Sequence, residues 1–477
     1  MVDKYIYKKI SEYFPYEPTE EQQKAIAAIA AFAADTTPRS LLILRGYAGT
    51  GKTSVLGAVV KALHAMERPS VLLAPTGRAA KVFAEYAERD AFTIHKKIYR
   101  QKSFSNDFGS FSLGKNLQKN TLFIVDEASM ISGDTGEMTP FGSGNLLDDL
   151  LSYVWSADEA KLIFVGDTAQ LPPVGTPLSD ALNAEVLTSR YGLHVYGMEL
   201  REVVRQKRGG ILHNATQLRE LLDEYADEDP EEILPIHLET EGWRGIFPVE
   251  GGTFIETLDE AYRKYGEEEC LVICPSNKLA LECNHAIRSS VLFYEEEPVV
   301  RGERLIVARN NYHHTKRPDR SDFIANGEII EVQRIGRHYY EYGLHFADAT
   351  IYLPDRDDSL EVRLLLTSLE DPTPQRSQAE RQRLFELIAS EYADIHSVTD
   401  RRKAIRRDPF WGALEVKYGY AVTAHKAQGG QWACVFVDLS LVGYLPEDRN
   451  LVRWIYTAIT RATKRVYLLG YPAGLVD

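Results

Sequence analysis

Short runs of consecutive apolar residues recur along the chain, and stretches with helical periodicity separate them. In the first part of the chain these runs are continuous, which is typical of parallel strands covered by helices on both faces. The runs are SLLILRG (40–46), VLLAPT (71–76), TLFIVDEA (121–128) and KLIFVGD (161–167). Together they predict an α/β unit built on one parallel sheet.

A second set of apolar runs follows an acidic stretch at 225–232. It consists of residues 269–276, 434–440 and 465–471, which predict another parallel sheet. Between these runs, residues 327–335 and 349–356 alternate between apolar and polar positions. We therefore expect a small antiparallel β module inserted in the second unit.

Helical periodicity returns after this module, where apolar residues recur over 384–395. A basic patch follows, made of Arg401, Arg402, Lys403, Arg406 and Arg407. We expect a helical arm. Its basic end either contacts nucleic acid or forms a solvated face packed on the module.

The composition indicates a globular protein with several domains. The 477 residues are 44% hydrophobic and 26% charged, and chains of this length form about two to four domains. No apolar run reaches the roughly 18 residues of a membrane span, and the N-terminal sequence lacks a signal-peptide core. We therefore expect a cytoplasmic protein without membrane contact. The four cysteines form no paired CxxC motifs, so we expect reduced thiols.

The net charge of −14 comes from 55 basic and 69 acidic residues. Such a balance argues against binding a polyanion by bulk electrostatics. If the protein binds nucleic acid, the binding groove must therefore be a confined part of its surface.

The strongest motif is GYAGTGKT at 46–53, which matches the phosphate-binding loop G-x-x-x-x-G-K-[ST] between a predicted strand and a predicted helix. Its glycines let backbone N–H groups approach phosphate oxygens at a helix N-terminus. Lys52 is expected to neutralise the β- and γ-phosphates of ATP, and the hydroxyl of Thr53 to bind Mg²⁺. The expected nucleotide-binding residues of this loop are Gly46, Gly49, Thr50, Gly51, Lys52 and Thr53.

An acidic pair follows the third apolar run. Asp126 and Glu127 lie at its carboxyl end, where ligands collect in open α/β sheets. We expect Asp126 to hold Mg²⁺ and Glu127 to orient or deprotonate the water that attacks the γ-phosphate. Most acidic pairs are ordinary loop surface, but the phosphate loop upstream favours the catalytic interpretation.

Two interpretations remain open for Gln22. With Thr19 it matches a helix capping box, in which each side chain satisfies a backbone donor at the helix start. Alternatively, its amide reads the edge of adenine, because an amide donates and accepts at once.

The order of these blocks resembles that of superfamily-one helicases of the B branch, specifically RecD-like and Dda-like enzymes. Further matching blocks are APTGRAAK (74–81), TIH (93–95), VGDTAQLPPVG (165–175), LREVVRQ (200–206), VTAHKAQGGQW (422–432) and YTAITRATKRVYLLG (456–470). The resemblance spans almost the whole chain. It implies two RecA-like domains with ATP in the cleft between them and single-stranded DNA across their tops.

The resemblance also implies roles for single residues. Gln170 would sense the γ-phosphate, and Arg205 and Arg461 would reach it from the second domain. Guanidinium groups that arrive across a cleft stabilise transition-state charge, although a surface salt bridge is the alternative for both arginines. The residues expected to line the strand groove, mostly with neutral donors, are Pro75, Thr76, Thr93, His95, Thr423 and His425.

Relatives carry a β-hairpin pin between the TIH block and the acidic strand, which corresponds to residues 100–120 here. Phe104, Phe108 and Phe111 lie in this segment. Each would either stack on a base and help to split the duplex, or close a minor core under a loop.

The expected domain division follows from this resemblance. The first RecA-like domain covers 1–99 and 121–195, the pin covers 100–120, the second RecA-like domain covers 196–329 and 416–477, and an SH3-like insert with a helical extension covers 330–415. The matched blocks begin about twenty residues into the chain and end close to its last residue. We therefore expect no accessory domain and a monomer that acts alone.

The expected function is an ATP-dependent DNA helicase that moves 5′ to 3′ on single-stranded DNA and unwinds duplexes at junctions, in DNA repair, recombination or replication. The polarity is implied by the family alone. An RNA-directed translocase stays open, because no motif reads a 2′-hydroxyl. So does a nucleotide-controlled switch that binds nucleic acid without unwinding. A small-molecule kinase would leave Arg461 and the HKAQGG block unexplained.

Overall fold

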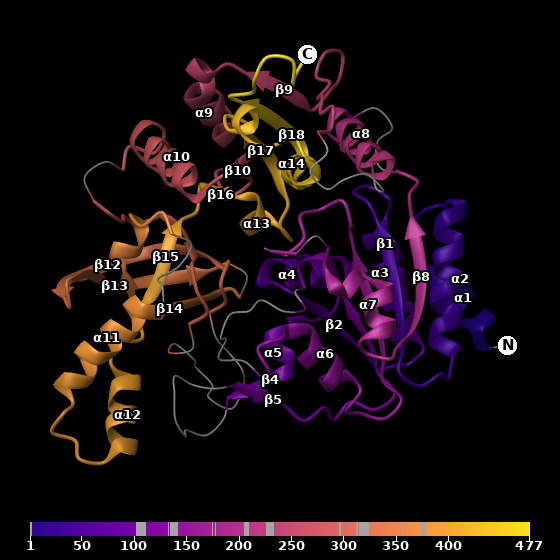
Figure 1. Ribbon diagram of the computed structural model, residues 1–477, viewed down its shortest axis with the longest axis horizontal. Helices are drawn as coiled ribbons and strands as arrows, with labels where there is room; N and C mark the ends of the chain where they lie inside the picture. The colour runs from indigo at the N-terminus through magenta and orange to yellow at the C-terminus, as the bar shows by residue number, and fades with distance from the viewer. Residues whose placement is uncertain are drawn as a thin grey trace.

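The structure is a computed structural model. It describes residues 2–101, 111–131, 133, 142–173, 175–176, 178–204, 209–225, 233–294, 297–311, 313, 324–354, 356–373 and 378–477. Figure 1 shows two α/β units beside each other, with a β barrel and a helical arm attached to the second. Within the described residues, no helix combines the length and apolar character that crossing a membrane requires.

The first unit is built on a six-stranded parallel sheet with the strand order β3-β2-β6-β7-β1-β8. Its strands are β1 (Ser40–Gly46), β2 (Ser70–Ala74), β3 (Ala91–Thr93), β6 (Leu122–Val125), β7 (Lys161–Gly166) and β8 (His194–Leu200). Helices α1 (Val2–Tyr13), α2 (Glu20–Ala34), α3 (Lys52–Ala65) and α4 (Gly77–Ala87) cover one face, and α5 (Ile94–Ile98), α6 (Leu146–Val154) and α7 (Ala184–Ser189) cover the other. Both faces are therefore buried, which explains the continuous apolar runs.

The second unit contains a five-stranded parallel sheet with the order β16-β10-β17-β18-β9. Its strands are β9 (Ile246–Val249), β10 (Cys270–Cys274), β16 (Ala421–Thr423), β17 (Trp432–Asp438) and β18 (Ala462–Leu469). Helices α9 (Phe254–Tyr265) and α10 (Asn277–Ser290) pack on one face, and α8 (Gly210–Glu224), α13 (Ala424–Ala427) and α14 (Arg449–Ile459) on the other. The fold class predicted from the sequence, two parallel-sheet α/β units in tandem, is confirmed.

The predicted antiparallel module is a closed five-stranded barrel. Its strands are β11 (Arg304–Val307), β12 (Ile329–Glu341), β13 (Leu344–Leu353), β14 (Asp358–Leu365) and β15 (Leu414–Tyr418). The arm consists of α11 (Gln378–Glu391) and α12 (Val398–Arg407), and Figure 1 shows it projecting from the barrel. Buried Leu384, Ile388 and Ile405 join the two helices in one small cluster.

Two strands differ from the expected domain boundaries. β8 pairs with β1 in the first sheet, so that sheet extends to Leu200, beyond the predicted boundary at 195. The barrel begins at Arg304 rather than at 330, because β11 pairs with both β12 and β15. A short antiparallel pair, β4 (Tyr99–Gln101) and β5 (Phe111–Leu113), flanks residues 102–110 of the predicted pin, which lie outside the described residues.

Candidate nucleotide site and strand groove

The phosphate loop connects β1 to α3, which begins at Lys52. Gly49 and Gly51 have φ angles of +81° and +85°, a backbone region that side chains disfavour. A Cβ atom added at Gly51 would lie 2.4 Å from Nε2 of Gln22. Nζ of Lys52 donates to the carbonyl oxygens of Gly46 (2.5 Å) and Tyr47 (2.9 Å), so the ammonium lies against the loop. Thr53 follows at the exposed start of α3.

Gln22 forms the capping box that the sequence predicts. Its backbone N–H donates to Oγ1 of Thr19, and its Oε1 accepts from the N–H of Thr19. Nε2 of Gln22 also donates to the carbonyl oxygen of Thr50 over 3.0 Å. The buried amide therefore ties α2 to the phosphate loop, and contact with adenine remains a prediction.

Asp126 and Glu127 follow β6 at the carboxyl edge of the first sheet. Oδ2 of Asp126 accepts from the hydroxyl of Tyr86 in α4 over 2.5 Å, and its Oδ1 accepts from the N–H of Glu127. Burial raises the pKa of both carboxyls, while the positive charge of Arg461 opposes this rise at Glu127. Arg461 therefore lies within electrostatic reach of Glu127. The sequence analysis did not select Tyr86 as a partner of Asp126.

The loop at 167–171 contacts the second unit directly. The N–H of Leu171 donates to Oγ1 of Thr457 over 2.8 Å, and its carbonyl accepts from Nε2 of Gln428 over 2.7 Å. Gln170 is buried in this loop, and its Oε1 has no hydrogen-bond partner among the described residues. An unpaired buried acceptor is costly, so this position suits a residue that binds a ligand.

Arg461 follows α14 and is 4% exposed. Its Nε donates to the carbonyl oxygen of Thr457, and one terminal nitrogen donates to the carbonyl of Gly430. A surface salt bridge, the alternative for Arg461, therefore does not describe it. Arg205, the other predicted arginine, lies outside the described residues.

The chain between the two units also contacts the phosphate loop. After β8, the N–H of Val204 donates to the carbonyl oxygen of Gly49 over 3.0 Å. The carboxylate of Glu21 in α2 accepts from the N–H groups of Arg201 and Glu202, both over 2.7 Å. The connection is thus anchored to two elements of the first unit.

The predicted groove residues lie at the carboxyl ends of strands in both sheets. Pro75 and Thr76 follow β2, Thr93 ends the adjacent β3, and Thr423 ends β16 in the second sheet. The hydroxyls of Thr76 and Thr93 cap α4 and α5. Arg78 in α4 bridges the sheets, because it donates to the carbonyl of Gln431 and its Cζ lies 3.9 Å from the ring centre of Trp432.

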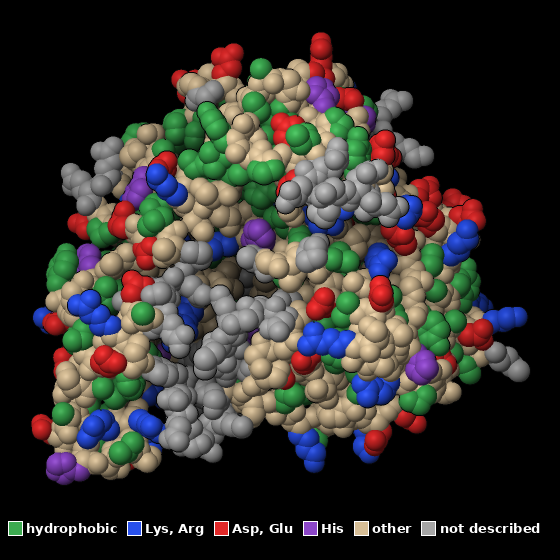
Figure 2. All heavy atoms as spheres, in the orientation of Figure 1, with side chains coloured by type: hydrophobic (Ala, Val, Ile, Leu, Met, Phe, Trp, Pro, Cys, Tyr) green, Lys and Arg blue, Asp and Glu red, His purple; other side chains and the backbone are tan. Residues whose placement is uncertain are grey.

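The two predicted groove histidines carry little positive charge near neutral pH. Burial lowers the pKa of His95 to about 4 and also lowers the pKa of His425. Both imidazoles therefore act as neutral hydrogen-bonding groups. Figure 2 shows the face between the barrel and the first unit as hollowed, with basic and acidic side chains interspersed around it.

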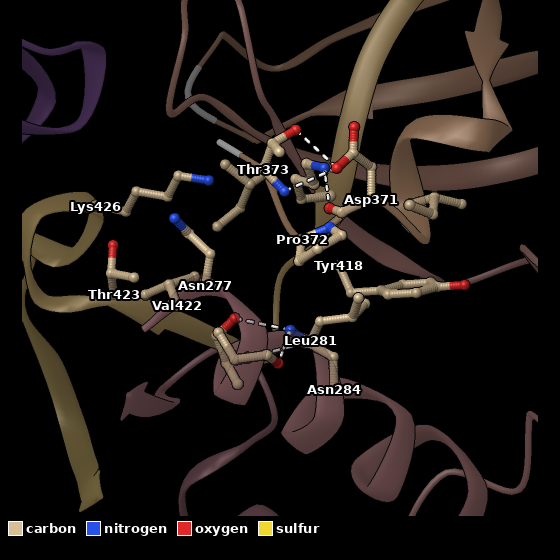
Figure 3. Close-up of a pocket in the computed structure, with 15 residues that line it drawn as sticks. Asn277, Leu281, Asn284, Asp371, Pro372, Thr373, Tyr418, Val422, Thr423 and Lys426 are labelled. Carbon is tan, nitrogen blue, oxygen red and sulfur yellow. Dashed lines mark hydrogen bonds between the residues drawn. The ribbon is translucent and has the colours of Figure 1, made fainter. Parts of the chain in front are cut away.

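A pocket lies beside Thr423, where α10, α13 and the barrel meet (Figure 3). The amide of Asn277, the ammonium of Lys426 and the side chain of Thr373 line it together. Burial and the nearby charge of Lys417 lower the pKa of Lys426 to about 8. The carboxylate of Asp371 also lines the pocket and accepts from the hydroxyl of Thr373, which leaves Lys426 and Asn277 as the groups that could attract a phosphate. The sequence analysis did not select Asn277, Thr373 or Lys426.

Of the two alternatives for Phe111, the structure supports closure of a core rather than stacking on a base. Its side chain is 7% exposed and packs in the same hydrophobic cluster as Phe123 and Tyr153. It closes a core and cannot stack on a base in this arrangement. Phe104 and Phe108 lie outside the described residues.

Comparisons with known proteins find similarity to ATP-dependent DNA helicases. Residues 17–234 match the model of an AAA domain, and residues 418–469 match the UvrD-like helicase C-terminal domain. The ATP-dependent RecD2 DNA helicase of Deinococcus radiodurans is 30% identical over 443 residues, which are 90% of this chain and 47% of that protein. The ATP-dependent DNA helicase dda of Enterobacteria phage T4 is 24% identical over 456 residues, 89% of this chain and 93% of that protein.

Over most of its length, this chain is similar in sequence to RecD-like and Dda-like superfamily-one helicases. Among solved structures, the Pif1 helicase from Bacteroides in complex with ADP-AlF3 and ssDNA is similar, with 15% identity and a TM-score of 0.47 over 97% of this chain and 95% of that chain. This chain spans less than half of the RecD2 relative but most of the Dda relative. Several of the matched blocks contact each other across the two units, through the bonds of Leu171 to Thr457 and Gln428 and of Arg78 to Gln431.

Proposed function

We propose that this protein is an ATP-dependent DNA helicase that moves 5′ to 3′ on single-stranded DNA and unwinds duplex DNA. The observation that carries the proposal is the position of Arg461. Its Nε donates to the carbonyl oxygen of Thr457, whose hydroxyl accepts from the N–H of Leu171, next to Gln170 in the first unit. Lys52 and the phosphate loop belong to that first unit. A triphosphate held between Arg461 and the phosphate loop would make closure of the two units depend on the nucleotide.

The residues present fit a nucleotide with Mg²⁺. Gly49 and Gly51 form a cradle that a side chain would strain, and the Oε1 atom of Gln170 is left for a ligand. Lys52 would hold the phosphates, and Thr53 and Asp126 would hold the metal ion. Bound Mg²⁺ supplies charge neutralisation at the phosphates. Glu127 orients the attacking water and accepts its proton, while Arg461 stabilises the charge that develops.

We propose that the strand lies across the carboxyl ends of both sheets. Thr76, Thr93 and Thr423 lie there beside neutral His95 and His425, with the Lys426 pocket at the second sheet. Mostly neutral donors fit a protein whose net charge is −14. Such a groove is expected to lose affinity with salt less steeply than a channel lined by lysines. Action as a monomer at junctions of single- and double-stranded DNA is part of the proposal.

A strand-displacement assay on duplexes with either a 5′ or a 3′ tail tests activity and direction together. We expect ATP-dependent displacement from the 5′-tailed duplex and strand-stimulated ATP hydrolysis that Lys52→Ala abolishes without unfolding the protein. Displacement from the 3′-tailed duplex alone would overturn the polarity. Hydrolysis without displacement on either tail would favour a nucleotide-controlled switch, and stronger stimulation by RNA of the same sequence would favour an RNA-directed translocase.

A further inference from the structure

The hydroxyl of Tyr456 joins the second unit to two loops of the first, one of which is the phosphate loop. Tyr456 belongs to α14 of the second unit and is 1% exposed. The N–H of Ala48, in the phosphate loop, donates to this hydroxyl over 2.9 Å. The hydroxyl donates in turn to Oδ2 of Asp167, just after β7, over 2.7 Å. One oxygen atom therefore connects two loops of the first unit to a helix of the second.

Both bonds have a defined direction. Burial, together with the negative charge of Asp167, raises the pKa of Tyr456 far above its usual value, so the hydroxyl keeps its proton at any working pH. Its single hydrogen goes to Asp167, and one of its lone pairs accepts from Ala48. Asp167 is 1% exposed, so removal of the hydroxyl would leave a buried carboxylate short of a donor.

The same turn of α14 holds the loop that carries Gln170. Thr457 accepts from the N–H of Leu171 through its hydroxyl, and its carbonyl accepts from Nε of Arg461. Helix α14 also shares a hydrophobic cluster with Ala424 and Ala427 of α13, the helix that carries His425 and Lys426. A shift of α14 is therefore transmitted both to Arg461 and to the groove.

We propose that Tyr456 is a positioning residue that couples the state of the nucleotide site to the grip on the strand. This inference rests on the proposed helicase function. If the phosphate loop adjusts its backbone N–H groups around a bound triphosphate, the hydrogen bond from Ala48 passes that change to α14. The hydrogen bond from the Tyr456 hydroxyl to Asp167 is a second link between α14 and the first unit. The Gln170 loop and α14 therefore move together.

The test compares Tyr456→Phe with Tyr420→Phe. Tyr420 is a matched control, because it is equally buried, accepts from the N–H of Arg304 and donates to Oε1 of Glu303, away from the nucleotide site. The readout is the ratio of the Kd values for labelled single-stranded DNA with and without a non-hydrolysable ATP analogue. Strand-stimulated kcat, KM for ATP and the melting temperature are measured in parallel.

For Tyr456→Phe we expect the ratio to approach one and the strand-stimulated kcat to fall on the order of tenfold, with little change in KM. Tyr420→Phe should keep the wild-type ratio. A wild-type ratio in Tyr456→Phe, or an equal loss in both variants, would overturn the proposal. If Tyr456→Phe does not fold, Asp167→Asn replaces it, because the amide disturbs the hydrogen bond with the Tyr456 hydroxyl. A wild-type ratio of Kd values in Asp167→Asn would also overturn the proposal. Wild-type protein without strand-stimulated ATP hydrolysis would refute the helicase function itself.

Discussion

Lys426 is expected to give strand binding a pH dependence of defined sign. Its ammonium lines the pocket at the junction of α10, α13 and the barrel, and burial lowers its pKa from 10.5 to about 8. The charged form attracts a phosphate and the neutral form does not. Strand affinity should therefore fall as the pH rises through 8, and it should be nearly constant below pH 7.

The expected size follows from one phosphate contact. Its loss between pH 7 and about 9.5 should raise the Kd on the order of tenfold, which corresponds to about 1.4 kcal/mol. Stability should respond in the opposite direction. Between pH 8 and about 10.5, Lys426 is protonated in the unfolded chain but largely neutral in the folded one. The free energy of unfolding should therefore increase as the pH rises through this range, by up to about 3 kcal/mol.

Fluorescence anisotropy with labelled single-stranded DNA at constant ionic strength measures the affinity, and urea unfolding at the same pH values measures the stability. Lys426→Arg is the matched variant, because a guanidinium stays charged throughout this range. Its affinity should not vary with pH. Two results would contradict this role of Lys426. One is a wild-type affinity that varies with pH as little as that of Lys426→Arg, and the other is a pH dependence that persists in Lys426→Arg.

Three further substitutions test other parts of the structure. Tyr86→Phe removes the hydroxyl that orients Asp126. The Mg²⁺ concentration for half-maximal ATP hydrolysis should therefore rise severalfold while the protein stays folded. An unchanged Mg²⁺ titration would contradict that role of Tyr86. Gly51→Ala places a Cβ atom 2.4 Å from Nε2 of Gln22, at a residue with a positive φ angle. The strained phosphate loop should bind nucleotide much more weakly, as measured by calorimetry. A wild-type affinity for nucleotide would show that the substitution does not strain the loop. Arg288→Met leaves the buried carboxylate of Glu303 without its bidentate partner and should cost about 3–5 kcal/mol in urea unfolding. The exposed Arg301→Met is its control, and equal losses in the two variants would refute the assignment.

Patterns that are contiguous in sequence could be predicted. The phosphate loop, the acidic pair and the buried strands can each be recognised within about ten residues, because local backbone geometry and burial determine their composition. The edge strand β8 could not be found in this way. Several of its side chains are exposed, so residues 194–200 lack the apolar pattern of the inner strands. β11 is four residues long, too short for a periodicity to emerge.

The hydrogen-bond partners of Asp126 and Asp167 could not be predicted for a different reason. Tyr86 lies 40 residues from Asp126, and Tyr456 lies 289 residues from Asp167. A tyrosine in an amphipathic helix has the same local sequence whether its hydroxyl meets a carboxylate or water. The tertiary structure alone brings these groups together. Phe111 illustrates the converse, since an aromatic residue in a polar segment turned out to belong to a core.

The anchored connection between the units has a mechanical consequence. The N–H of Val204 donates a hydrogen bond to the carbonyl oxygen of Gly49, and the N–H groups of Arg201 and Glu202 donate to the carboxylate of Glu21. A pulling load on the DNA, borne by the second unit, would reach the nucleotide along the covalent backbone as well as through side chains. The apparent affinity for ATP should therefore become sensitive to force, which an optical-trap measurement at several tensions would register as a shift in KM.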